Sequence, residues 1–455
     1  MSEDKRALLK QRMETGQLRL QPLTLPQREL WEASPVPVGD MANHICCLIE
    51  VRGKVTPEDG ARALKLVADR QEALRTSFLS GKDGPVQMIR HEGSMNMRFR
   101  ELSPAQSDPE AIEEIASGIF HGPFDLLQGP LYRVELMRRA VDDHVLVFAI
   151  HHAIADGWTL GVFTRDLCLA YVQSMFGIQR LLGMRETLSP VSMSYTAWGA
   201  SERAFWQPSE LAPRTAFWKN HLAGYVRLWN TLEGPNTATG AHVRLVSQIP
   251  AELVKAVREL ARRNRATLFS TLLTVFQVAL SRWTGADDIL VGTPVANRSK
   301  ESAKKTMGYF AGIVPLRGRV DVERSFSSLV SAMHQTTVDC FANAMPFVEL
   351  SQALGDLGGP GHNPIFEVRF ALQNHPIPDV ALPGLAAKLR MRSTGTARFH
   401  IACEITEDDK QFEVAWLFRP HLFPQTDVEN LGRMFQTLLT AACRSPDARI
   451  ATLSN

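Results

Sequence analysis

Apolar and polar positions along the chain alternate between strand-like and helix-like segments. Short apolar runs, typical of strands, lie at 44–52, 131–137, 145–150, 243–249, 288–292, 365–372, 399–405 and 412–418. Longer segments with helical patterns lie at 4–15, 109–120, 159–176, 253–261 and 426–442. Thr56, followed by a proline and two acidic residues, adds a helix start. Because strands and helices alternate in both halves, the pattern predicts an α/β fold.

The length of the chain and one weakly patterned stretch predict two lobes. A chain of 455 residues exceeds the size at which a single hydrophobic core keeps growing. Between 177 and 213 the periodicity weakens while Ser, Pro and Gly accumulate. We therefore predict a first lobe over 1–180 and a second over 181–455.

The composition of the chain argues against several functional classes. The net charge is +2 and no dense Lys/Arg run occurs, which argues against a nucleic-acid or membrane-surface partner. The charged N-terminal segment does not resemble a signal peptide, and no stretch of about 18 apolar residues predicts a membrane span. The six cysteines show no CxxC spacing, so we expect free thiols in a reducing cytoplasm and no metal site.

One segment combines a strand, two histidines and a helix start. The apolar run 145–150 leads into His151-His152-Ala-Ile-Ala-Asp156-Gly157-Trp158. Adjacent strand residues point to opposite faces, so one imidazole should pack inward while the other lines a cleft. The same geometry argues against a shared metal ion. A neutral imidazole suits the role of base toward an amine or alcohol, and Asp156 could orient it or pair with an arginine.

Other readings of these residues stay open at this point. Two adjacent histidines alone are more often packing residues than catalysts, and Asp156 could serve only as an acid at a helix N-terminus. Gly157 indicates a backbone conformation or a close approach that a Cβ would block. The complete five-position pattern HHxxxDG carries more information than either residue pair.

Seven further segments support a functional reading of HHxxxDG. In chain order they are 24–31, 70–78, 194–198 with 217–218, 292–298, 308–317, 345–347 and 363–374. Together with HHxxxDG they resemble the motifs of nonribosomal peptide synthetase condensation domains, which are grouped with chloramphenicol-acetyltransferase-like enzymes. The sequence departs from these motifs at Glu29, Gln71 and Gly312, where arginine, histidine and asparagine are usual. These departures leave the substrate and acceptor type in doubt.

The resemblance implies two similar lobes arranged as a V, with the active site in a tunnel at their junction. It implies that His152 is the catalytic histidine, that His151 is its structural neighbour and that Gly157 lies near the reacting thioester. Asp156 would pair with an arginine, for which Arg75 is the first choice and Arg70 the second. The remaining candidates are two supporting residues and five tunnel residues: Asn297, Arg298, Trp158, Tyr309, Phe310, Asn363 and Gln373.

Purely structural roles are also possible for several of these residues. The aromatic residues Trp158, Tyr309 and Phe310 could be core residues. Asn297 and Arg298, which follow a strand and a Thr-Pro turn, and Asn363, which precedes a proline, could be turn residues. Arg75 could be a solvated charge.

The implied reaction is acyl transfer to an amine or hydroxyl without a covalent enzyme intermediate, which fits the absence of a GxSxG elbow. No cofactor would be bound, because the acyl group arrives on the phosphopantetheine of a donor carrier protein; the acceptor would be carrier-bound or free. Because the chain lacks adenylation and carrier signatures, we expect it to be free-standing and to work on thioesters carried by other proteins. The two similar lobes favour a monomer, and the free cysteines favour the cytoplasm. Two rival functions remain: a coenzyme A-dependent acyltransferase, and a non-catalytic platform for carrier proteins.

Overall fold

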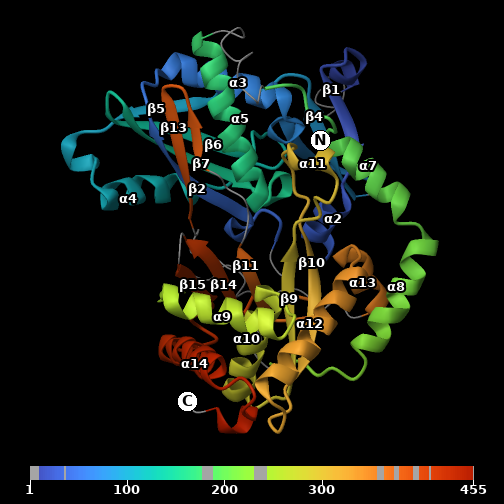
Figure 1. Cartoon of the computed structure of the whole chain (residues 1–455). Helices are drawn as coiled ribbons and strands as arrows, with labels where there is room; N and C mark the ends of the chain where they lie inside the picture. The colour runs from blue at the N-terminus through green and yellow to red at the C-terminus, as the bar shows by residue number, and fades with distance from the viewer. Residues whose placement is uncertain are drawn as a thin grey trace.

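The computed structural model describes residues 10–34, 37–82, 84–176, 188–229, 243–355, 363–373, 379–392, 399–408 and 411–453. Two lobes lie one above the other in Figure 1, and each is built on a six-stranded sheet. The helix predicted over 4–15 and the boundary predicted at 180 fall partly or wholly outside the described residues. The α/β class is confirmed.

The N-terminal lobe contains a sheet with the strand order β12-β13-β2-β7-β6-β5. Its strands are β2 (His44–Arg52), β5 (Met97–Glu101), β6 (Tyr132–Ala140), β7 (Asp143–His151), β12 (Val380–Leu382) and β13 (Leu385–Arg392). Its main helices are α3 (Pro57–Arg70), α4 (Pro109–Phe120) and α5 (Gly157–Phe176). The predicted start of α3 is confirmed, since the Thr56 hydroxyl accepts the Asp59 N–H.

The alternation of side chains along β7 assigns a helix to each face of this sheet. Phe148 stacks on Phe163 of α5, with ring centroids 3.8 Å apart. His151 points to the other face, where it lies beside His44 and where the Phe120 carbonyl of α4 contacts the His44 ring. The helices α3 and α5 therefore cover one face and α4 the other.

A small sheet and a short helix flank this lobe. The sheet has the order β1-β4-β3, with β1 (Leu18–Pro22), β3 (Thr76–Gly81) and β4 (Gly84–Arg90). The helix α2 (Leu25–Glu32) begins with a capping box between Thr24 and Gln27.

The C-terminal lobe contains the second sheet, ordered β10-β9-β11-β14-β15-β8. Its strands are β8 (Val243–Ile249), β9 (Asp288–Val295), β10 (Gly312–Arg319), β11 (Val368–Gln373), β14 (Ile401–Asp408) and β15 (Gln411–Phe418). Its helices are α9 (Ala251–Arg263), α10 (Leu268–Thr284), α11 (Glu301–Lys304), α12 (Phe326–Ala342), α13 (Phe347–Leu354) and α14 (Gln425–Arg444). The helices α7 (Tyr195–Phe205) and α8 (Pro208–His221) run down one side of the molecule from the upper lobe to the lower one (Figure 1).

Two segments of the C-terminal half cross into the N-terminal lobe. Strand β13 pairs antiparallel with β2, so it completes the upper sheet, as its orange colour among blue and green elements shows in Figure 1. The segment 296–311, which we call the bridging segment, leaves β9, contacts the N-terminal lobe and returns into β10. The division of the chain into 1–180 and 181–455 therefore does not describe β12 and β13, which belong to the first lobe in space.

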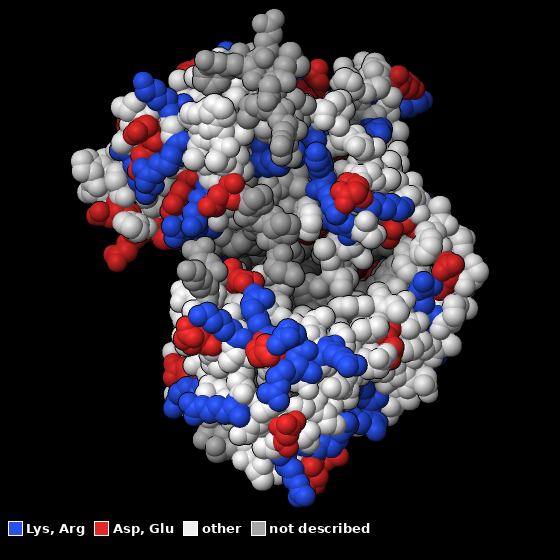
Figure 2. Space-filling view, in the orientation of Figure 1, with Lys and Arg blue, Asp and Glu red and all other residues white. Residues whose placement is uncertain are grey.

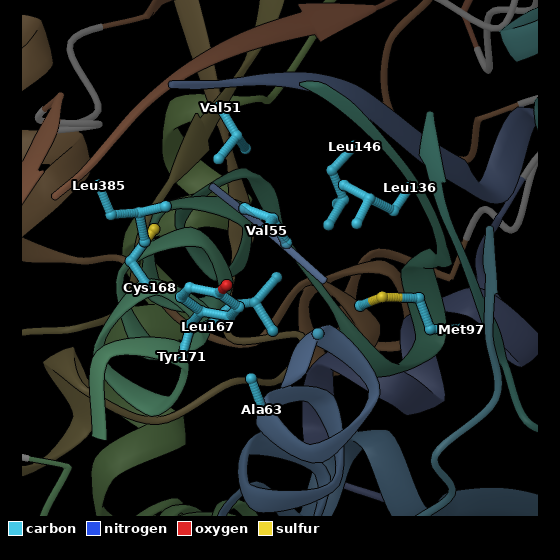
Figure 3. Close-up of a pocket in the computed structure, with 11 residues that line it drawn as sticks. Val51, Val55, Ala63, Met97, Leu136, Leu146, Leu167, Cys168, Tyr171 and Leu385 are labelled. Atoms are coloured by element: carbon cyan, nitrogen blue, oxygen red, sulfur yellow. The ribbon is translucent and has the colours of Figure 1, made fainter. Parts of the chain in front are cut away.

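The core of the N-terminal lobe contains a cavity of about 40 Å³ between the sheet and helices α3 and α5 (Figure 3). Its lining is mostly aliphatic, and the hydroxyl of Tyr171 in its wall already donates to the Lys54 carbonyl. The Cys168 thiol on its wall has a pKa raised to about 12 by burial. All six cysteines are free thiols, as predicted. No described helix is both long and apolar enough to cross a membrane.

Candidate active site between the lobes

His151 is the last residue of β7 and is fully buried. Its Nε2 lies 2.8 Å from the Val38 carbonyl oxygen, and its Nδ1 accepts the Ala153 N–H at 3.0 Å. A carbonyl only accepts hydrogen bonds, so Nε2 carries the proton. Burial lowers the pKa of His151 to about 3. His151 is therefore a neutral residue that holds the start of the following turn.

His152 begins a one-turn 3-10 helix, so its ring leaves the sheet and is partly exposed. Its Nδ1 lies 2.8 Å from the Ala155 carbonyl oxygen. The proton of the neutral ring is therefore on Nδ1, and Nε2 presents a lone pair. The edge of the ring meets Tyr309, with centroids 4.7 Å apart at 67°. The two rings lie as the strand pattern predicts, with His151 buried and His152 partly exposed, and the catalytic role of His152 stays a prediction.

Asp156 is buried and its carboxylate pairs with Arg298 of the other lobe. Arg298 Nη2 donates to Asp156 Oδ1 at 2.9 Å and lies 3.1 Å from Oδ2. Asp156 Oδ1 also accepts the Thr159 N–H, and Oδ2 accepts the Phe310 N–H at 3.1 Å. One buried carboxylate thus joins the turn after His152 to the bridging segment.

The predicted partners of Asp156 were wrong. The Arg75 guanidinium donates to the backbone carbonyls of Ala68, Asp69, Arg90 and His91, where it closes a loop of the N-terminal lobe. Arg70 instead pairs with Asp166 of α5. Both arginines belong to the motif at 70–78, but neither contacts Asp156 among the described hydrogen bonds.

Arg298 follows strand β9 through a left-handed turn at Asn297, whose φ is 50°. Its Nη1 donates to the carbonyls of Ala303 and Thr306, at 2.8 and 2.6 Å, so it also folds the bridging segment on itself. The guanidinium carbon lies 3.8 Å from the centroid of the Phe310 ring. Arg298 therefore acts as the structural turn residue considered from sequence, and its contact with Asp156 also joins this turn to the N-terminal lobe.

Comparison with known proteins places the whole described site within one family. The family model described as "Condensation domain" matches residues 17–455. The chain belongs to the condensation-domain family. It is 28% identical over 444 residues to a component of the linear gramicidin synthase of Brevibacillus parabrevis, with 95% of this chain and 8% of that protein covered. It is 30% identical over 441 residues to phosphinothricin tripeptide synthetase PhsB of Streptomyces viridochromogenes, with 95% and 36% covered. The chain thus spans well under half the length of these relatives.

Solved structures give the same fold. The SgcC5 protein from Streptomyces globisporus has a TM-score of 0.79 at 22% identity, with 94% of this chain and all of that chain covered. The X-domain from teicoplanin biosynthesis has a TM-score of 0.80 at 21% identity, with 95% and 97% covered. The prediction of a chloramphenicol-acetyltransferase-like condensation fold is therefore confirmed. Figure 2 shows the surface of this condensation domain hollowed between the two lobes.

The residues predicted to line a tunnel occupy different environments. Gly157 is the partly exposed first residue of α5, and Gln373 is the partly buried last residue of β11. The Trp158 Nε1–H donates to the Lys304 carbonyl at 3.0 Å. Phe310 is fully buried in a small cluster with Tyr195, so it is a packing residue. The Asn363 side chain accepts two backbone N–H groups of its own turn, as expected of a turn residue.

Two departures from the family motifs have a structural explanation. A Cβ on Gly312 would lie 2.9 Å from Nδ2 of Asn297, so an asparagine there would displace the Asn297 side chain. Gln71 is buried and contacts the bridging segment. Glu29 is buried on α2, with 8% of its surface exposed.

Thr159 was not recognised from the sequence. Its hydroxyl lies 2.9 Å from both Asp156 Oδ1 and the Gly308 carbonyl oxygen, and it accepts the Gly308 N–H at 3.2 Å. Its position three residues after Asp156, in the first turn of a helix, is the signal that could have indicated a side-chain contact. Among the described residues, no group of three or more His, Cys, Asp and Glu side chains could hold a metal ion.

Proposed function

We propose that this condensation domain transfers an acyl group from a carrier-protein phosphopantetheine thioester to an amine or hydroxyl acceptor. The observation that carries the proposal is the hydrogen bond between His152 Nδ1 and the Ala155 carbonyl. It gives a partly exposed imidazole whose Nε2 can accept a proton, beside Tyr309 of the bridging segment. Relatives named as gramicidin and phosphinothricin tripeptide synthetases support a substrate drawn from peptide biosynthesis.

The acceptor N–H or O–H would place its proton toward His152 Nε2 while its nitrogen or oxygen attacks the thioester carbon. The carbon–sulfur bond then breaks, and the departing thiolate takes the proton back from the imidazolium. An amide or ester and a free carrier thiol are the products, and the enzyme returns to its neutral state. General base catalysis and the positioning of two tethered substrates would supply the rate enhancement.

His152→Ala tests this role. We expect turnover of a carrier-bound donor to fall about 100-fold or more, while thermal unfolding and carrier binding stay at wild-type values. His91→Ala, at an exposed position away from the site, is the matched control. An unchanged product yield in His152→Ala would remove this residue from the reaction.

The donor carrier is tested with one acyl group presented in two ways, on carrier protein and on coenzyme A. Turnover from carrier protein and not from coenzyme A is the expected result. The reverse would favour the coenzyme A-dependent alternative.

A docking platform is the second candidate function. It is favoured by the fold similarity to a teicoplanin X-domain solved in complex with OxyB, with a TM-score of 0.81. A platform would bind carrier protein equally well with and without His152 and would yield no product in either case.

A further inference from the structure

Besides the pair Asp156–Arg298, a second buried polar connection joins the N-terminal lobe to the bridging segment. It involves three residues, which we call the Gln71 cluster: Arg70, Gln71 and Asp166. Gln71 lies between α3 and the next 3-10 turn, and Asp166 lies on α5, so the cluster joins the two helices that cover one face of the upper sheet. Gln71 and Asp166 are fully buried.

The Gln71 side chain uses both ends of its amide across the lobes. Its Oε1 accepts the Met307 N–H at 2.9 Å. Its Nε2 donates to the Lys305 carbonyl at 3.0 Å and to Asp166 Oδ2 at 2.8 Å. Arg70 Nη1 also donates to Asp166 and lies 3.3 Å from the same Lys305 carbonyl. The amide orientation is fixed, because its acceptor faces an N–H group and its donors face two oxygens.

The residues held in this way lead directly to the catalytic histidine. Met307, which Gln71 contacts, is two residues before Tyr309, whose ring packs against His152. Gly308, between them, is held by Thr159. A shift of the bridging segment at residues 305–307 would therefore move the Tyr309 ring that contacts His152.

We propose that the Gln71 cluster positions the bridging segment for catalysis, with Gln71 as a positioning residue that acts on His152 through Met307 and Tyr309. This inference rests on the proposed function. It makes the choice of glutamine specific, because a carboxylate at position 71 would have no N–H for Asp166 or for the Lys305 carbonyl, and Arg70 would be left as the donor of the cluster to both. A neutral imidazole, the usual side chain here in the family motif, offers one donor and one acceptor and keeps part of the connection.

The kinetic test compares Gln71→Glu, Gln71→His and the exposed Gln106→Glu as a matched control. For Gln71→Glu we expect kcat to fall 10- to 100-fold at pH 8 with KM for the donor carrier unchanged, since small misplacements of reacting groups cost that much. Activity should recover partly toward pH 6, where one proton is shared between the two carboxylates. Gln71→His should keep most of the wild-type kcat. Wild-type kcat and an unshifted pH profile in Gln71→Glu would overturn the proposal.

Hydrogen exchange on the wild-type protein tests the connection without a variant that could misfold. The amides of Met307, Gly308 and Phe310 should exchange as slowly as those of strand β7. Tryptic cleavage after Lys305 should be slow in the wild type and faster in Gln71→Glu. Rapid exchange at these amides in the wild type would overturn the cluster's role, whatever the activity. A wild type that binds carriers but gives no product would instead overturn the proposed function.

Discussion

Replacing Arg298 with methionine would show how much the contact between the two lobes depends on one buried ion pair. The Arg298 and Asp156 side chains are 1% and 4% exposed, so neither charge is screened by water. Methionine fills similar space but removes the donors to Asp156, Ala303 and Thr306. The Asp156 carboxylate would remain buried, with only Thr159 and Phe310 as donors.

Removing one partner from a buried pair costs about 3–5 kcal/mol, chiefly because the other charge stays buried. For a 455-residue chain that unfolds as one unit, the free energy of unfolding falls by about 1 kcal/mol for each kelvin of warming near its Tm. Arg298→Met should therefore lower Tm by about 3–5 °C. If the lobes unfold separately, the shift of the affected transition would be about twice as large.

A double-mutant cycle with Asp156→Asn assigns the partner. Differential scanning calorimetry of Arg298→Met, Asp156→Asn and the double variant should show that the double variant loses less than the sum of the single losses. In the same cycle Arg75→Met should be additive with Asp156→Asn, because Arg75 contacts only backbone carbonyls among its described hydrogen bonds. Coupling to Arg75 instead of Arg298, or an Arg298→Met Tm within about 1 °C of wild type, would refute this reasoning.

Two further changes test burial in the N-terminal lobe. Because burial lowers the pKa of His151 from 6.5 to about 3, its contribution to stability is complete above pH 6.5 and is lost as the pH falls toward 3, by about 2 kcal/mol at pH 5. His151→Gln should therefore shrink the Tm difference between pH 7 and pH 5 by about 2 °C, and an equal difference in both proteins would contradict this. Gly60→Ala should raise Tm by about 1 °C through helix propensity, as its methyl group would point toward the flexible Met97 sulfur at 3.1 Å, beside the cavity. Gly118→Ala, at an exposed position of α4, controls for helix propensity alone. A lower Tm in Gly60→Ala only would show that Met97 cannot move.

Strong local patterns predicted the central elements well. Three elements have the expected bounds: the strands at 44–52 and 243–249 and the helix at 109–120. Their signals, apolar runs and helix caps, depend only on residues that are neighbours in the sequence. Strand β4 was not predicted, since Pro85 near its start and its mixed polarity weaken the pattern. Strand β13 was missed because its residues alternate between buried and exposed positions next to charged residues.

Partners across the fold were the part that local patterns could not supply. His151 and His152 were separated correctly, because the two faces of a strand follow from geometry alone. The arginine that pairs with Asp156 was not predicted correctly. Arg298 is 142 residues away in the chain and comes close only once the bridging segment has docked. Gln71 appeared as a departure from a motif, but its meaning depended on Met307 and Lys305, which the sequence does not mark as neighbours.

The pairing of β13 with β2 has a consequence for synthesis of the chain. The main-chain groups of β2 that face β13 cannot pair with it until residue 392 has been translated, some 340 residues after β2 itself. At roughly 5–20 residues per second, an apolar strand edge stays open for about 20–70 s on the ribosome. During that interval the nascent first lobe presents an unpaired edge strand, to which a strand of another chain could add.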